Sequence, residues 1–153
     1  MKGKKVCNMK YDGNNYVNIY KFQKHHFKKI LNLMLNLSST FQIVEEYGEL
    51  SVENLNIHQD FISITRSNKW PGTIKGPKAY VYSFKMTKNI TDFLGKYDGF
   101  LSCEEGCFVS KALEDQSDYS FFEKETGGCL LFTISHEGDV FLREDIYNKY
   151  FVK

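Results

Sequence analysis

The clearest periodic pattern in this sequence is a helical one between residues 24 and 38. Apolar residues recur there at the spacing i, i+3, i+4, i+7 and i+8, at Phe27, Ile30, Leu31, Met34 and Leu35. Lysine and asparagine occupy most of the opposite side, so a helix here would be apolar on one side and polar on the other. We predict an amphipathic helix over residues 24–38 whose apolar stripe faces a core.

Strand patterns fill much of the remaining chain. Residues 79–86 alternate large apolar side chains with smaller or polar ones, which is the period of a half-buried strand. Stretches rich in β-branched and aromatic residues predict further strands at 16–22, 41–47, 61–64, 119–123, 128–135 and 140–143. Proline and glycine predict a loop over residues 67–78.

Two shorter helices complete the predicted elements. Thr87 or Asn89 can cap a helix that runs to about Tyr97, and acidic residues in a first turn favour another helix over 144–152. The predicted fold class is α+β, a mainly antiparallel sheet with one amphipathic helix packed on a face and short additional helices. Because no repeat or linker divides the chain, we predict one domain over residues 1–153, in which 1–13 form a flexible basic N-terminal segment.

Charge is sorted along the sequence. Residues 1–30 contain eight lysines and one acid, a net charge of +7, whereas residues 89–153 contain six basic and thirteen acidic residues, a net charge of −7. The formal net charge of +1 therefore conceals a strongly dipolar chain. Only Arg66 and Arg143 are arginines, and arginine is the residue that recognises phosphates and guanine edges in a bidentate way. We therefore expect no direct nucleic-acid partner.

The apolar segments are short. No apolar run is long enough to span a bilayer, and no apolar region of signal-peptide length follows the basic N-terminus. We expect a soluble cytoplasmic protein without a membrane partner, in which the four cysteines are free thiols. Two disulfides would be the alternative in a secreted chain.

Metal and histidine chemistry give two alternatives without a diagnostic motif. Cys103 and Cys107 could bind zinc if Cys129 and His136 completed the ligand set, but the cysteine spacing is unusual, and we predict no metal and no cofactor. His136 with His58 or His26 could serve as a general acid and base in RNA cleavage. Any chain with several histidines and many lysines meets that requirement, so we predict that the protein is not an enzyme.

An acidic stretch with interleaved aromatic residues lies between Glu104 and Glu125. Such a stretch can form a negatively charged docking surface with aromatic anchors, which would bind a basic protein such as a nuclease. The predicted partner-binding residues are Glu104, Glu105, Glu114, Asp115, Asp118, Tyr119, Phe122, Glu123 and Glu125.

In general character the chain resembles the small immunity proteins of bacterial contact-dependent and related interbacterial toxin systems. The shared features are one small domain, a composition typical of an AT-rich gene, the acidic segment Glu104–Glu125 and a terminal hairpin over 128–142. The resemblance implies an antitoxin-like inhibitor that occludes the active site of a cognate toxin, often a nuclease. The alternatives are the histidine-based ribonuclease and a module that assembles with itself, basic end to acidic end.

Overall fold

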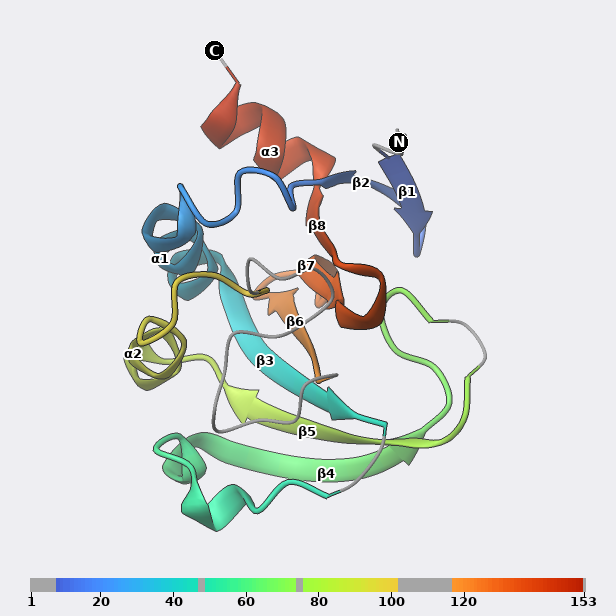
Figure 1. Ribbon diagram of the computed structural model, residues 1–153, viewed down its shortest axis with the longest axis vertical. Helices are drawn as coiled ribbons and strands as arrows, with labels where there is room; N and C mark the ends of the chain where they lie inside the picture. Colours follow the sequence, from blue (N-terminus) through green and yellow to red (C-terminus); the bar gives the residue numbers. More distant parts are fainter. Residues whose placement is uncertain (1–7, 47–48, 74–75, 102–116, 153) are drawn as a thin grey trace.

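An antiparallel sheet organises the computed structural model, which describes residues 8–46, 49–73, 76–101 and 117–152. In this part of the chain eight strands follow the order β1-β2-β8-β7-β6-β3-β5-β4, and every neighbouring pair is antiparallel (Figure 1). The strands are β1 (Asn8–Tyr11), β2 (Asn14–Asn18), β3 (Ser38–Glu45), β4 (Phe61–Ser67), β5 (Ala79–Lys85), β6 (Asp118–Glu123), β7 (Cys129–Ile134) and β8 (Asp139–Arg143).

Helices and short turns connect these strands. The described α-helices are α1 (Phe27–Leu37), α2 (Lys88–Leu94) and α3 (Glu144–Phe151), and the 3₁₀ turns are η1 (Val52–Asn54), η2 (His58–Asp60) and η3 (Ser135–Glu137). The predicted α+β class with a mainly antiparallel sheet is confirmed. A single helix on the face is not confirmed, because α2 lies beside α1 (Figure 1). None of the described helices combines the length and the apolar composition that a bilayer-spanning segment requires.

The predicted amphipathic helix corresponds to α1. It buries Phe27, Ile30, Leu31 and Met34, and these side chains join strand residues such as Phe84 in the main core cluster. We call the sheet face that carries this cluster the inner face. The helix begins later than predicted because the residues before it form turns, and it ends where Ser38 enters β3 directly.

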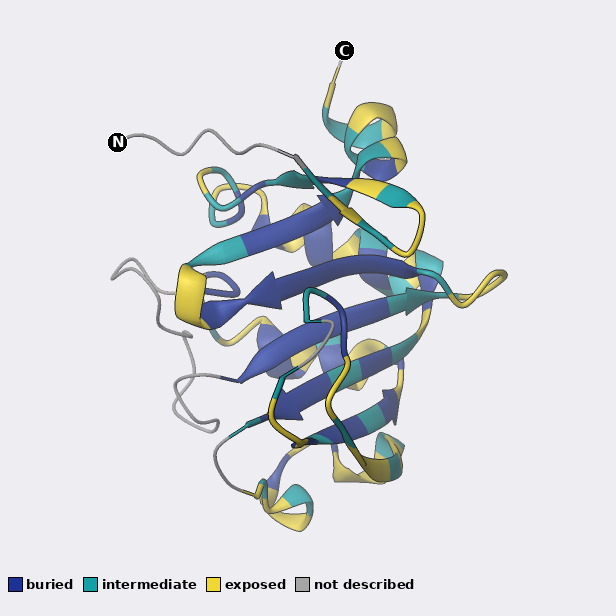
Figure 2. Cartoon of the chain, turned by 90° about the vertical axis from the view of Figure 1, so that its right-hand side faces the viewer, coloured by how far each residue is buried: buried dark blue, intermediate teal, exposed yellow. Residues whose placement is uncertain are grey.

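The opposite, outer face is also covered. Trp70, in the predicted loop after β4, packs with Val44, Ala79 and Val81 in a separate buried cluster. Figure 2 shows the result, since the middle strands are buried and the exposed residues gather around their ends and at the periphery. A sheet that is covered on both faces buries polar residues of its central strands together with apolar ones.

The N-terminal prediction requires a correction. Residues 8–11 form β1, which pairs with β2, so they belong to the sheet rather than to a flexible segment. Asp12 and Gly13 connect the two strands with φ angles of 54° and 82°. Positive φ at both central residues is typical of a two-residue hairpin turn, for which Asp-Gly is a preferred sequence. Residues 1–7 of the predicted segment lie outside the described residues.

Candidate protein-binding surface

The structure divides the predicted partner-binding residues into three groups. Glu104, Glu105, Glu114 and Asp115 lie outside the described residues. Asp118 and Tyr119 are buried, with 4% and 2% of their surface exposed. Phe122 and Glu123 are half-buried, and Glu125 is exposed in the turn between β6 and β7. The described part of the predicted surface therefore reduces to Phe122, Glu123 and Glu125.

Asp118 has a structural role at the start of β6. Its Oδ1 accepts a hydrogen bond from the Ser135 backbone N–H at 2.7 Å, and the Thr133 hydroxyl lies 3.5 Å from the same oxygen. Burial raises the pKa of the Asp118 carboxyl to about 6, although the hydrogen bond from Ser135 acts in the opposite direction. The carboxylate thus holds the end of β7 in place and is not displayed to a partner.

Tyr119 belongs to the main core. Its ring centroid lies 5.7 Å from that of Phe41 and 6.3 Å from that of Phe100. Its backbone N–H donates to the Thr133 hydroxyl at 3.0 Å. The predicted aromatic anchor is therefore a core residue, because adjacent positions of β6 point to the two covered faces of the sheet.

Glu123 forms part of a charged cluster around Arg143. The Arg143 guanidinium donates to Glu123 at 3.0 Å and binds Asp145 through two hydrogen bonds of 2.8 and 3.1 Å. Only 11% of the Arg143 side chain is exposed. These hydrogen bonds lower the pKa of both carboxyls and raise the pKa of Arg143. One arginine thereby connects β6, β8 and α3.

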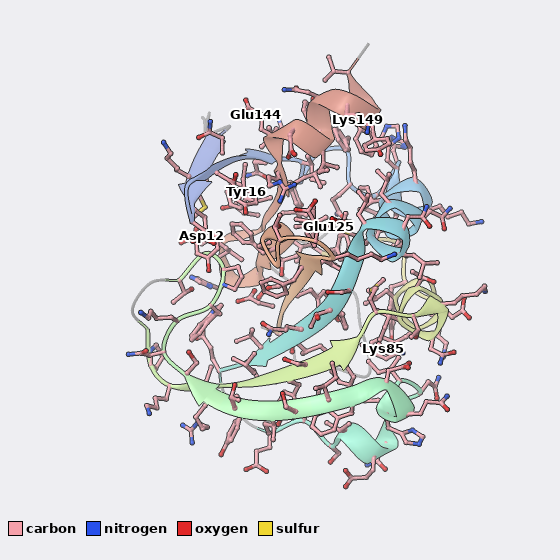
Figure 3. All side chains as sticks on the ribbon, turned by 180° about the vertical axis from the view of Figure 1, so that it is seen from behind. Asp12, Tyr16, Lys85, Glu125, Glu144 and Lys149 are labelled. Atoms are coloured by element: carbon pink, nitrogen blue, oxygen red, sulfur yellow. The ribbon has the colours of Figure 1, made fainter. Side chains whose placement is uncertain are left out.

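A hollow of about 370 Å³ opens beside this cluster. It is lined by Asp12, Asn14, Glu123, Thr126, Gly128, Arg143 and Asp145. Glu144 begins α3 and accepts a hydrogen bond from the Asn15 amide at 3.4 Å. Figure 3 shows Asp12 and Glu144 on either side of Tyr16, with Lys85 at a distance beside β5. We define the acidic surface as Asp12, Glu123, Glu125, Glu144 and Asp145.

Apolar side chains border the acidic surface. Tyr11 and Phe122 are half-buried and pack, together with Met9, against a buried cluster on the outer face. The Tyr16 hydroxyl in this cluster donates to the Cys129 carbonyl at 2.7 Å, which fixes β2 relative to β7. The acidic surface therefore has aromatic residues at its edge, and these residues pack against buried side chains of the sheet.

Several of these residues were not predicted from the sequence. Tyr11 and Asp12 fell in the segment expected to be flexible, although the Asp-Gly turn could have identified a hairpin there. Glu144 and Asp145 were assigned only to the first turn of a helix. The pairing of β2 with β8 brings the N-terminal hairpin close to the start of α3. This pairing joins residues that are far apart in the sequence, so no local sequence pattern could predict it.

Other acids of the C-terminal third lie elsewhere. Asp139 accepts a hydrogen bond from the Asn18 amide at 2.8 Å, and Glu137 lies 3.7 Å from the His136 ring in η3. They lie at the end of β8 that is opposite to Arg143, about 13 Å away along the strand. The described carboxylates of the C-terminal third are therefore distributed over separate places and do not form the single patch that the sequence suggested.

The structure does not bring His58 and His136 together, as the histidine-based ribonuclease alternative would require. His58 in η2 precedes the edge strand β4, and His136 in η3 follows β7. Four strand spacings separate β4 from β7 in the sheet, which corresponds to about 19 Å. The ring of His26, at the start of α1, packs against the aromatic rings of Phe22 and Phe151.

The zinc alternative depends on Cys103 and Cys107, which lie outside the described residues. Cys129 is buried in β7, and burial raises the pKa of its thiol to about 12. Within the described ranges, no three or more of the histidine, cysteine and acidic side chains gather in a way that could hold a metal ion.

Comparisons with protein-family models, with curated proteins and with solved structures give no match for this chain.

Proposed function

We propose that this chain is a protein-binding inhibitor of the immunity-protein type, which acts in the cytoplasm by occluding the active site of a cognate toxin. The observation that supports it best is the acidic surface with Tyr11 and Phe122 at its edge. Its five carboxylates outnumber the neighbouring basic residues, Arg143, Lys124 and Lys10, so the net charge of these side chains is negative.

Order in the acidic surface favours binding. Arg143 holds Glu123 and Asp145 in fixed positions, and Asn15 contacts Glu144. Side chains that are already ordered lose less conformational entropy when a partner binds. The surface can therefore present carboxylates in a defined arrangement to a cationic cleft.

A nuclease domain is the toxin that this surface fits best. Nucleases hold the phosphate backbone in a positively charged cleft, and ordered carboxylates can occupy such a cleft in place of phosphates. Negative potential accelerates encounter with a positive partner, whereas a few desolvated aromatic side chains supply much of the affinity. The half-buried Phe122 and Tyr11 would supply those contacts.

The test uses the toxin domains encoded by neighbouring genes as candidate partners. We expect one of them to form a stoichiometric complex with the chain and to lose its activity in that complex. The double variant Glu125→Lys/Glu144→Lys should lower the association rate constant about tenfold at low salt, because it reverses two charges of the acidic surface.

A matched control has the same change in net charge. Glu49→Lys/Glu53→Lys alters two exposed acids before and within η1, away from the acidic surface. Equal association rates for the two double variants would contradict the assignment of the surface. If no neighbouring toxin is bound or inhibited, the proposed function itself is wrong.

A further inference from the structure

The edge strand β4 has one strand neighbour. It is the last strand of the sheet and pairs with β5 (Figure 1). In the described part of the chain its other side forms no backbone hydrogen bonds. The segment 49–60 runs near this edge, but it buries Leu55 and Ile57 in the main core. Within the described ranges, the N–H and C=O groups on this side of β4 have no backbone partner, so another strand could pair with them.

Exposed apolar side chains concentrate on the same strand. Of the four large apolar residues that are exposed in the described ranges, three lie on β4: Phe61 at 37%, Ile62 at 58% and Ile64 at 45%. Edge strands of soluble proteins are commonly protected by lysine, proline or short length. The opposite edge follows that rule, since β1 has four residues and includes Lys10. In contrast, β4 has seven residues and no lysine or proline, and its one irregularity in register with β5 lies at its start, between Phe61 and Ser63.

We infer that β4 pairs antiparallel with β4 of a second copy, so that the two sheets become continuous across a two-fold axis. The sequence of the strand suits this symmetry. Pairing centred on Ile64, in the regular part of the strand, places Ser63 opposite Thr65 of the other copy. No like charges then face each other, and β-branched side chains meet at the axis.

The position of Arg66 supports a second copy as the occupant. Its guanidinium lies 4.3 Å from the Tyr80 ring centroid of its own chain. The only charge on β4 is thus directed onto the neighbouring strand and away from the axis. This inference is independent of the proposed function, because β4 and the acidic surface involve different strands.

Sedimentation equilibrium tests the inference on the full chain. We expect a monomer–dimer equilibrium at concentrations up to about 100 μM, which persists at high salt because β pairing and apolar contact are little screened. Ile64→Lys should raise the dimer dissociation constant at least about tenfold, since the substitution acts in both copies. Val152→Lys, which alters the exposed apolar residue outside β4, should leave it unchanged.

Ile62→Lys provides a second variant at the most exposed of these positions, and circular dichroism establishes that each variant is folded. A chain that remains monomeric over the whole concentration range would overturn the inference. A dimer that dissociates with salt would instead indicate pairing of basic and acidic ends. Equal weakening by Val152→Lys and Ile64→Lys would place the interface elsewhere.

Discussion

Replacement of Asp118 by asparagine should remove the pH dependence that this buried carboxyl imposes on stability. The pKa of Asp118 is raised from 3.8 to about 6 because the group is buried, so the folded state binds its proton more tightly than the unfolded state. The contribution of this group to the free energy of unfolding is therefore fully present below pH 3.8 and is lost as pH rises through 6. A shift of this size removes about 2 kcal/mol between pH 4 and pH 7. In Asp118→Asn the amide oxygen can still accept the hydrogen bond from Ser135.

Urea unfolding of both proteins at several pH values between 4 and 7 measures the effect. The free energy of unfolding of Asp118→Asn minus that of the parent chain should increase by about 2 kcal/mol across this range. Titrating groups that do not interact with Asp118 cancel in the difference. Glu125→Gln serves as the control, because it removes one exposed carboxylate from the same part of the chain. A difference that stays constant with pH, or that decreases, would refute the argument.

Three further substitutions test the packing and charge of the fold. Gly72→Ala should be less stable than Gly127→Ala by about 1–3 kcal/mol in urea unfolding, because both glycines have positive φ but only the Cβ at Gly72 would lie 2.9 Å from a core ring. Tyr16→Phe should lose about 1 kcal/mol, since a buried carbonyl loses its hydrogen-bond donor. Arg143→Gln should lose about 1–2 kcal/mol at pH 7 and less near pH 3, because the two carboxyls with lowered pKa lose their partner only where they are ionised.

The sequence predicts elements well where local signals agree. Apolar spacing identified α1, and the Thr87 hydroxyl accepts a hydrogen bond from the Asn89 N–H at the start of α2, as a capping residue should. The final helix was likewise correct, and the described residues between β4 and β5, 68–73 and 76–78, lie outside strands of the sheet as the predicted loop requires. The predicted strand at 16–22 was too long, because the chain leaves the sheet after Asn18.

Burial in β6 was not predictable from its own residues. An acid followed by an aromatic residue at the start of a strand is typical of an exposed edge, yet β6 lies inside the sheet. Asp118 is buried where Ser135, the residue directly after β7, donates a backbone hydrogen bond to it. Tyr119 is covered by Phe41 and Phe100, which are distant in sequence. Both outcomes depend on tertiary contacts that no window of the sequence contains.

The distribution of charged residues along the sequence does not predict their distribution over the folded surface. The antiparallel path of β8 places Asp139 near one end and Arg143 at the other, so acids only a few residues apart belong to different surfaces. Arg143 then affects the acidic surface in two opposing ways. It reduces the negative charge that steers a partner, and it orders the carboxylates that a partner would contact. The surface therefore gains order at the expense of net charge, so for the proposed binding the arrangement of the carboxylates should matter at least as much as their number.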